Sequence, residues 1–293
     1  MSGTEIDAIV ARIHATYARW NRATPIATIR ADWNALFPPP GADVDVEQVT
    51  IGGMPARWIA APGTGRTRIF VYFHGGGYRA GSSDSHGDLV ARLSAASGMA
   101  GLALDYPLVP EHPFPAAIDA LEAFWRALLD IRDAGTVAWA GDSAGANLAL
   151  AGLVRCARLG WPLPARVALL SPWTDLAARG DSYASRAAAD PLHTRDGLLA
   201  MARAYLNGAD PLDPLASPIA ADMAGWPPML VQVGDREVVL DDARGLVVRA
   251  AAGGDARLSV WPGMIHVFQQ FAAELPEARA AIAEIGAFLK DTA

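Results

Sequence analysis

Apolar residues recur with two different periods along this chain, and the change from one period to the other predicts its architecture. Near the N-terminus they fall on one face of a helix, at Ile6, Ile9, Val10, Ile13, Tyr17 and Trp20. The proline run within residues 37–41 is predicted to end this helical region. Short apolar runs of strand length follow, and they predict strands at 44–51, 56–60, 68–73, 99–104, 136–140, 166–170, 229–233 and 258–261.

Helical patterns separate most of these strands, at 86–97, 115–133 and 146–154. This alternation predicts an α/β fold in which helices cover both faces of a mainly parallel central sheet. Residues 174–225 form an insertion far longer than the usual link between two strands, with a helical pattern at 195–206. We therefore expect a core in two parts, 46–173 and 226–293, interrupted by this insertion.

The strongest indication of chemistry is the motif Gly141-Asp142-Ser143-Ala144-Gly145, between a predicted strand and a predicted helix. A Gly-x-Ser-x-Gly motif in this setting is typical of the nucleophile elbow of α/β-hydrolases. The turn is tight, so residues on either side of the serine must be small. The motif predicts that Ser143 is a nucleophile held at the N-terminus of a helix, where developing negative charge is favoured.

A second motif, His74-Gly75-Gly76-Gly77, ends the predicted strand at 68–73. Acyl transfer places negative charge on a carbonyl oxygen, and backbone amides that can approach closely stabilise it. Such a glycine loop is typical of the oxyanion hole of lipases and esterases. We expect the amides of Gly76, Gly77 and Ala144 to be the donors.

These motifs, together with the segment from Asp105 to Ala116, resemble those of the bacterial hormone-sensitive-lipase family of α/β-hydrolase esterases. The resemblance implies an α/β-hydrolase fold in which residues 1–45 and 174–225 pack together as a helical cap over the nucleophile. It also implies a small-molecule ester as substrate and a homodimer formed through the last strand and helix. Residues expected to line the substrate pocket are Tyr78, Tyr183 and Tyr205, together with Trp20, Trp33, Phe37 and Leu192.

A serine nucleophile needs a general base and an acid, which follow the serine along the chain in this fold. Of the six histidines, His266 alone lies after the last predicted strand, and we expect it to be the base. The acid is open between Glu237 and Asp235, both after the strand at 229–233. The family pattern favours Glu237, whereas Asp235 lies closer to the end of the strand. Asp241 and Asp242 are expected to begin the next helix.

Composition limits the other classes of function. Net charge is −7 without a basic run, which argues against a nucleic-acid partner. No apolar run is long enough to cross a bilayer, and the N-terminus lacks the pattern of a signal peptide, so we expect no membrane association. Metal-ligand spacings and a phosphate-binding loop are absent from the sequence, so neither metal nor cofactor is expected. The single cysteine, Cys156, is typical of a cytoplasmic protein.

The sequence therefore predicts a carboxylic-ester hydrolase that acts on short-chain acyl esters through Ser143, His266 and Glu237. Two alternatives stay open. A lactonase, an amidase or an acyltransferase would use the same covalent intermediate and differ in pocket or acceptor. A binding protein that has lost catalysis would share the fold but not require an intact serine, acid and histidine.

Overall fold

A single eight-stranded sheet organises the computed structural model, which describes residues 2–291. Its strand order is β1-β2-β4-β3-β5-β6-β7-β8. β1 and β2 pair antiparallel, β2 joins β4 antiparallel, and all other neighbours are parallel. The strands are β1 (Asp45–Ile51), β2 (Met54–Ala60), β3 (Gly65–Phe73), β4 (Met99–Leu104), β5 (Val137–Asp142), β6 (Val167–Leu170), β7 (Met229–Gly234) and β8 (Ala256–Trp261). The predicted α/β fold with a mainly parallel sheet is confirmed.

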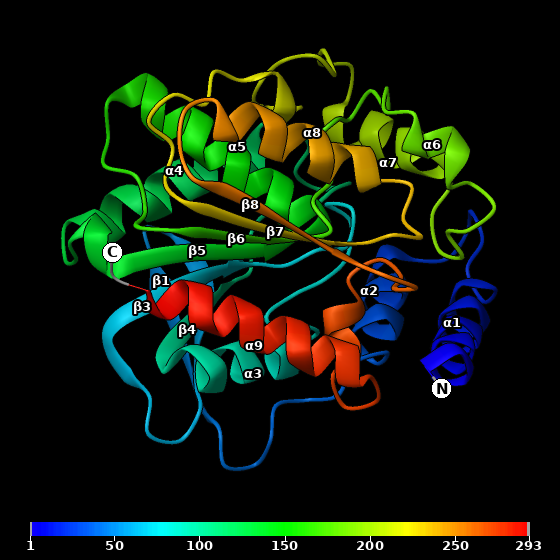
Figure 1. Ribbon diagram of the computed structural model, residues 1–293, viewed down its shortest axis with the longest axis horizontal. Coiled ribbons are helices and arrows are strands. Elements are labelled where there is room, and N and C mark those ends of the chain that lie inside the picture. Colours follow the sequence, from blue (N-terminus) through cyan, green and yellow to red (C-terminus); the bar gives the residue numbers. More distant parts are fainter. Residues whose placement is uncertain (1, 292–293) are drawn as a thin grey trace.

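Helices cover both faces of the sheet (Figure 1). α3 and α9 pack on one face, and α4, α5 and α8 pack on the other. The helices are α1 (Ser2–Tyr17), α2 (Ile26–Asn34), α3 (Gly87–Ser97), α4 (Ala116–Leu129), α5 (Ser143–Leu159), α6 (Ser182–Ser185), α7 (Arg195–Leu206), α8 (Leu240–Ala251) and α9 (Pro276–Lys290). Within residues 2–291, no helix combines the length and the apolar character that crossing a membrane requires.

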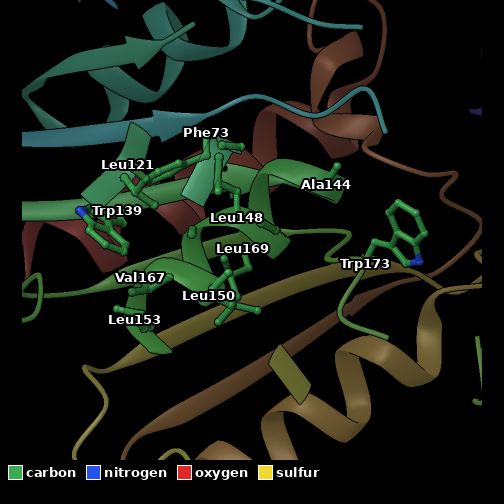
Figure 2. Close-up of a cluster of buried hydrophobic side chains, with 14 of the residues drawn as sticks. Phe73, Leu121, Trp139, Ala144, Leu148, Leu150, Leu153, Val167, Leu169 and Trp173 are labelled. Atoms are coloured by element: carbon green, nitrogen blue, oxygen red, sulfur yellow. The ribbon is translucent and has the colours of Figure 1, made fainter. Parts of the chain in front are cut away.

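The core forms two layers because β3 and its neighbours are buried on both sides. Phe70 and Tyr72 point into the layer beneath α3 and α9, whereas Val71 and Phe73 point into the layer beneath α4 and α5. Figure 2 shows the second layer, where Trp139 of β5 lies against Phe73. Trp139 meets the rings of Phe73 and Trp125 edge to face, at centroid distances of 5.2 and 4.9 Å. This packing fixes the strand that leads to Ser143.

Several element ends differ from those expected. β5 continues to Asp142 and α5 begins at once with Ser143, because the tight turn leaves no residue between strand and helix. α4 ends at Leu129, earlier than residue 133, and Asp133 caps a separate short turn by accepting from the Gly135 amide. α1 ends at Tyr17, so Trp20 lies beyond the helix on which the periodicity placed it.

Helices α1, α2, α6 and α7 gather at one end of the sheet (Figure 1). A hydrogen bond of 2.7 Å between His14 Nε2 and the Pro191 carbonyl oxygen joins α1 to the insertion. Arg30 of α2 pairs with Glu111 at 2.7 Å. The two expected parts of the cap are therefore in contact, while the domain boundaries themselves stay a prediction.

Candidate active site

Ser143 occupies the turn between β5 and α5. Its φ of 52° is left-handed, a strained conformation for a residue that carries a side chain. A Cβ atom on Gly145 would lie 2.1 Å from the Phe73 carbonyl oxygen, and one on Gly141 would lie 2.9 Å from the same oxygen. Neither position has room for a side chain, so the expectation of a tight turn with small neighbours is confirmed.

The side chains of Ser143, His266 and Glu237 form one continuous hydrogen-bonded chain. Ser143 Oγ lies 2.9 Å from His266 Nε2, and His266 Nδ1 lies 2.7 Å from Glu237 Oε2. These residues come from the ends of β5, β8 and β7, which meet at the same edge of the sheet. The arrangement gives the serine hydroxyl a neighbouring base, and gives that base a carboxylate to orient it.

The electrostatics of this chain favour proton transfer from the serine. A carboxylate only accepts hydrogen bonds, so Glu237 holds the imidazole hydrogen on Nδ1 and leaves Nε2 as an acceptor toward Ser143. Burial on its own lowers the pKa of His266, but the hydrogen bond and the negative charge of Glu237 outweigh burial and raise that pKa above 6.5. His266 is thus a stronger base than a free histidine.

The second oxygen of Glu237 is also held. Oε1 accepts from the Ser171 hydroxyl at 2.8 Å and from the Gly234 amide. Ser171 Oγ in turn accepts from the Val267 amide at 3.0 Å, next to the histidine. Ser171 therefore ties the acid to the histidine loop, a contact that the sequence analysis missed.

The other carboxylates of this segment point elsewhere. Asp235 Oδ1 accepts from the Gly263 amide at 2.7 Å, whereas the carboxylate that bonds His266 is Glu237. Asp241 and Asp242 lie in the first turn of α8, as expected. Asp242 is buried and accepts from the amides of Thr174 and Asp175 at 2.7 and 2.9 Å. Burial raises its pKa to about 7.

The glycine loop approaches Ser143 with its backbone free. Gly76 has a φ of 114°, and a Cβ atom there would lie 2.3 Å from the Ala80 carbonyl oxygen. Within residues 2–291, the amides of Gly76 and Gly77 have no acceptor. Ala144 lies in the first turn of α5, where amides have no partner within the helix. All three amides are thus available to an oxygen bound beside Ser143.

Asp142, which precedes the nucleophile, holds this loop from behind. Its Oδ1 accepts from the Gly75 amide at 2.9 Å and from the Tyr72 hydroxyl at 2.8 Å, and lies 3.2 Å from His86 Nε2. Burial on its own raises the pKa of Asp142, but His86 and the hydrogen bonds outweigh burial and lower that pKa below 3.8. An ionised carboxylate therefore fixes the glycine loop, a role that the sequence analysis did not assign.

A cavity of about 270 Å³ opens onto Ser143 and His266. Most of its wall is apolar, and both the N-terminal segment and the insertion contribute to it. The expected pocket residues that line it are Trp20, Trp33, Phe37 and Leu192. His193 and Met201 of the insertion also line it, and neither was among the expected pocket residues.

The three tyrosines predicted to bind substrate do not line this cavity, and that prediction is wrong. Tyr78, Tyr183 and Tyr205 are buried in the apolar core, with at most 2% of each exposed. Tyr78 has a left-handed φ of 60°, and its ring stacks on that of Tyr205 at 3.7 Å. Its hydroxyl donates to Asn147 Oδ1 at 2.6 Å. Tyr78, directly after the three glycines, thus combines a left-handed backbone with a ring that is packed in the core.

Comparison with known proteins agrees with this geometry. A family model for the alpha/beta hydrolase fold matches residues 70–270. An acetyl-hydrolase from Streptomyces hygroscopicus is 45% identical over 254 residues, which cover 86% of this chain and 83% of the relative. An esterase from Acinetobacter venetianus is 35% identical over 257 residues, with 86% and 84% covered. The crystal structure of an esterase from the bacterial hormone-sensitive lipase family matches with a TM-score of 0.93 and 42% identity, covering 98% of this chain and 97% of that one.

The chain belongs to the bacterial hormone-sensitive-lipase family. The resemblance inferred from the sequence motifs is thereby confirmed. Three residues near the serine, histidine and glutamate were not expected from the sequence: Ser171, Asp142 and His193. Ser171 and Asp142 stand at the ends of strands, a position that could have singled them out, whereas His193 carried no signal beyond its place in the insertion.

Proposed function

We propose that this hormone-sensitive-lipase family member hydrolyses carboxylic esters, with Ser143 as nucleophile, His266 as general base and Glu237 as the orienting acid. The observation that carries the proposal is the hydrogen-bonded chain of 2.9 and 2.7 Å that joins these three residues, of which Ser143 and His266 line the cavity. The relatives named esterase and acetyl-hydrolase support the same class of reaction.

The proposed reaction has two steps. Ser143 Oγ attacks the ester carbonyl carbon while His266 Nε2 takes the hydroxyl proton. The amides of Gly76, Gly77 and Ala144 hold the oxyanion that forms. His266 then gives its proton to the departing alcohol, and an acyl-serine remains. Water, deprotonated by His266, releases the carboxylic acid and restores the enzyme.

We propose short-chain acyl esters as substrates because the cavity is small. Its volume of about 270 Å³ lies below the range of about 300–1,000 Å³ typical of pockets for drug-sized ligands. The apolar wall suits an alkyl or aryl group, and the name acetyl-hydrolase of the Streptomyces relative fits a short acyl group.

The test is hydrolysis of p-nitrophenyl esters from acetyl to palmitoyl by the wild type and Ser143→Ala. We expect turnover of the short esters only, and a loss of at least about a thousandfold in kcat for Ser143→Ala. Ser185→Ala, at an exposed serine of the insertion, is the matched control and should retain wild-type activity. Labelling by a fluorophosphonate should give one adduct that Ser143→Ala does not form. Full activity in Ser143→Ala would refute the proposed nucleophile.

We also propose a homodimer through β8 and α9, as the family resemblance implies. β8 is the last strand of the sheet, and its outer edge is free for pairing within the described chain. Val260 on this strand is 37% exposed. Light scattering at micromolar concentration should give twice the monomer mass of 30.8 kDa, and a monomer mass would refute the dimer.

We propose a cytoplasmic location for the protein, which the single buried thiol of Cys156 supports.

A further inference from the structure

His193, in the segment between α6 and α7, packs directly on His266. The two ring centroids are 4.4 Å apart, and the ring planes meet at 69°, so one ring presents its edge to the other. His193 also lines the cavity that contains Ser143. A side chain from the insertion thus forms the wall of the cavity next to the base.

The backbone holds His193 in a fixed place relative to the site. Asp190 Oδ1 accepts from the amides of Leu192 and His193 at 2.9 and 3.0 Å. Asp190 Oδ2 accepts from the Val238 amide at 2.9 Å, one residue after Glu237. The buried Asp190 carboxylate therefore joins the His193 segment to the segment that carries the acid.

The imidazole of His193 has polar capacity that the protein does not use. Within residues 2–291, neither ring nitrogen has a hydrogen-bond partner, and Nδ1 is enclosed. Burial and the charge of His266 lower the pKa of His193 to about 4, so the ring is neutral at pH 7. A neutral imidazole has one N–H donor and one acceptor. An enclosed nitrogen is better tolerated as an unpaired acceptor than as an unpaired N–H, which favours the hydrogen on Nε2.

The chemistry of the reaction determines which part of an ester lies beside His193. His266 Nε2 must donate its proton to the oxygen of the departing alcohol, so this oxygen lies within hydrogen-bond distance of His266. The groups packed around His266 inside the cavity therefore border the alcohol part of the ester. Among them, His193 presents a hydrogen-bonding ring in a wall that is otherwise mainly apolar.

We propose that His193 is a specificity-determining residue that selects esters of alcohols that carry a second oxygen, a hydroxyl or an ether. The ring donates a hydrogen bond to that second oxygen while the ester oxygen faces His266. This inference rests on the proposed ester hydrolysis and adds the class of alcohol to it.

The test compares two pairs of esters of equal size. On the alcohol side, 2-hydroxyethyl acetate is compared with propyl acetate; on the acyl side, methyl glycolate is compared with methyl propionate. In each pair a hydroxyl replaces a methyl group, and the ratio of kcat/KM within the pair is measured. Differences in intrinsic reactivity cancel when the ratio of a variant is divided by that of the wild type.

His193→Phe keeps an aromatic ring against His266 but removes both ring nitrogens. We expect it to lower the alcohol-side ratio about fivefold, the effect of one neutral hydrogen bond, and to change the acyl-side ratio less than about twofold. His193→Gln keeps a donor and should retain most of the alcohol-side ratio. Met201→Leu, on the cavity wall at Gly77, is the control for a general change in the cavity and should leave both ratios unchanged.

An unchanged alcohol-side ratio in His193→Phe would overturn the inference, and so would an equal change in both ratios, which indicates a general effect on His266. Neither of these two results would affect the proposed ester hydrolysis by the wild type. Thermal unfolding checks that the variants fold. If His193→Phe does not fold, His193→Leu replaces it, since its side chain also has no polar atoms. A wild type that hydrolyses none of the four esters, with no fluorophosphonate adduct on Ser143, would instead refute the proposed function and the inference with it.

Discussion

Replacing Glu237 by Gln removes the negative charge with almost no change in shape, and the structure determines how the amide will sit. Glu237 Oε1 accepts from the Ser171 hydroxyl and the Gly234 amide, so the amide oxygen of the variant must take that position. The NH2 group then faces His266 Nδ1, where Oε2 stands 2.7 Å away in the wild type. Two donors cannot bond each other, so the histidine hydrogen moves to Nε2 and the ring can no longer accept the Ser143 proton.

We therefore expect Glu237→Gln to lose about 10³–10⁴-fold in kcat, the size found when a triad carboxylate becomes an amide in a serine protease. This loss equals about 4–5.5 kcal/mol of transition-state stabilisation. KM should change little, since Glu237 is fully buried and does not line the cavity. The assay is steady-state hydrolysis of p-nitrophenyl acetate, with thermal unfolding to show that the variant is folded.

Asp235→Asn is the matched control because it makes the same chemical change two residues away. Asp235 accepts from the Gly263 amide, and an Asn oxygen can accept the same bond. We expect its kcat to stay within about threefold of the wild type, as for a substitution outside the reacting groups. A large loss in Asp235→Asn, or more than a tenth of wild-type activity in Glu237→Gln, would refute this assignment of the acid.

Three further predictions follow from the buried polar groups. For the wild type, kcat/KM should fall as pH decreases through the raised pKa of His266, because only the neutral ring accepts a proton. A midpoint below 6.5 in the pH–rate profile would contradict the stabilisation of the protonated His266 ring by Glu237. Asp242 has its pKa raised by burial from 3.8 to about 7, so the folded state binds a proton more tightly than the unfolded state and stability falls as pH rises through this range. In urea unfolding, the stability of Asp242→Asn relative to the wild type should therefore increase between pH 4 and 8 by up to about 4 kcal/mol, and equal pH dependence in both proteins would refute the ionisation. Tyr78→Phe should cost about 1–2 kcal/mol of stability by leaving the buried Asn147 oxygen without a donor, with KM for short esters within about twofold; a KM several times higher would return Tyr78 to the substrate site.

The fold was predictable because the central strands β4, β5, β6 and β7 are buried along their whole length and therefore appear as nearly unbroken apolar runs. The edge strands β1 and β8 are partly exposed and mix apolar with polar residues. All eight runs became strands, and the helices between them cover both faces of the sheet. The spatial order was not predictable in the same way, since β3 lies between β4 and β5 and no local pattern encodes which strands pair. Element ends shifted where a local turn or cap, such as the Asp133 side chain on the Gly135 amide, ends an element that the apolar pattern alone would continue.

The glycines and the histidine of the site were predictable because each has a chemical requirement that few residues meet. The tyrosines were not, since an aromatic residue serves a pocket wall and a core equally well. Tyr78 follows three glycines directly, yet its left-handed φ accompanies a ring packed on Tyr205 in the core. That conformation depends on the contacts around the glycine loop, which one sequence does not reveal.

The residues of the site share one topological feature that explains how the network forms. Ser143, Ser171, Glu237 and His266 follow β5, β6, β7 and β8 in that order, and these four parallel strands are neighbours in the sheet. Since parallel strands bring their carboxyl ends to one edge, side chains just beyond successive strands become neighbours there. Ser171 lies between the strand of the nucleophile and the strand of the acid, and it bonds both Glu237 and the backbone beside His266. A polar residue at the end of a strand in such a series is therefore a candidate for the network, even where its type suggests no chemistry. The same reasoning identifies Asp142, at the end of β5, as the residue that fixes the glycine loop.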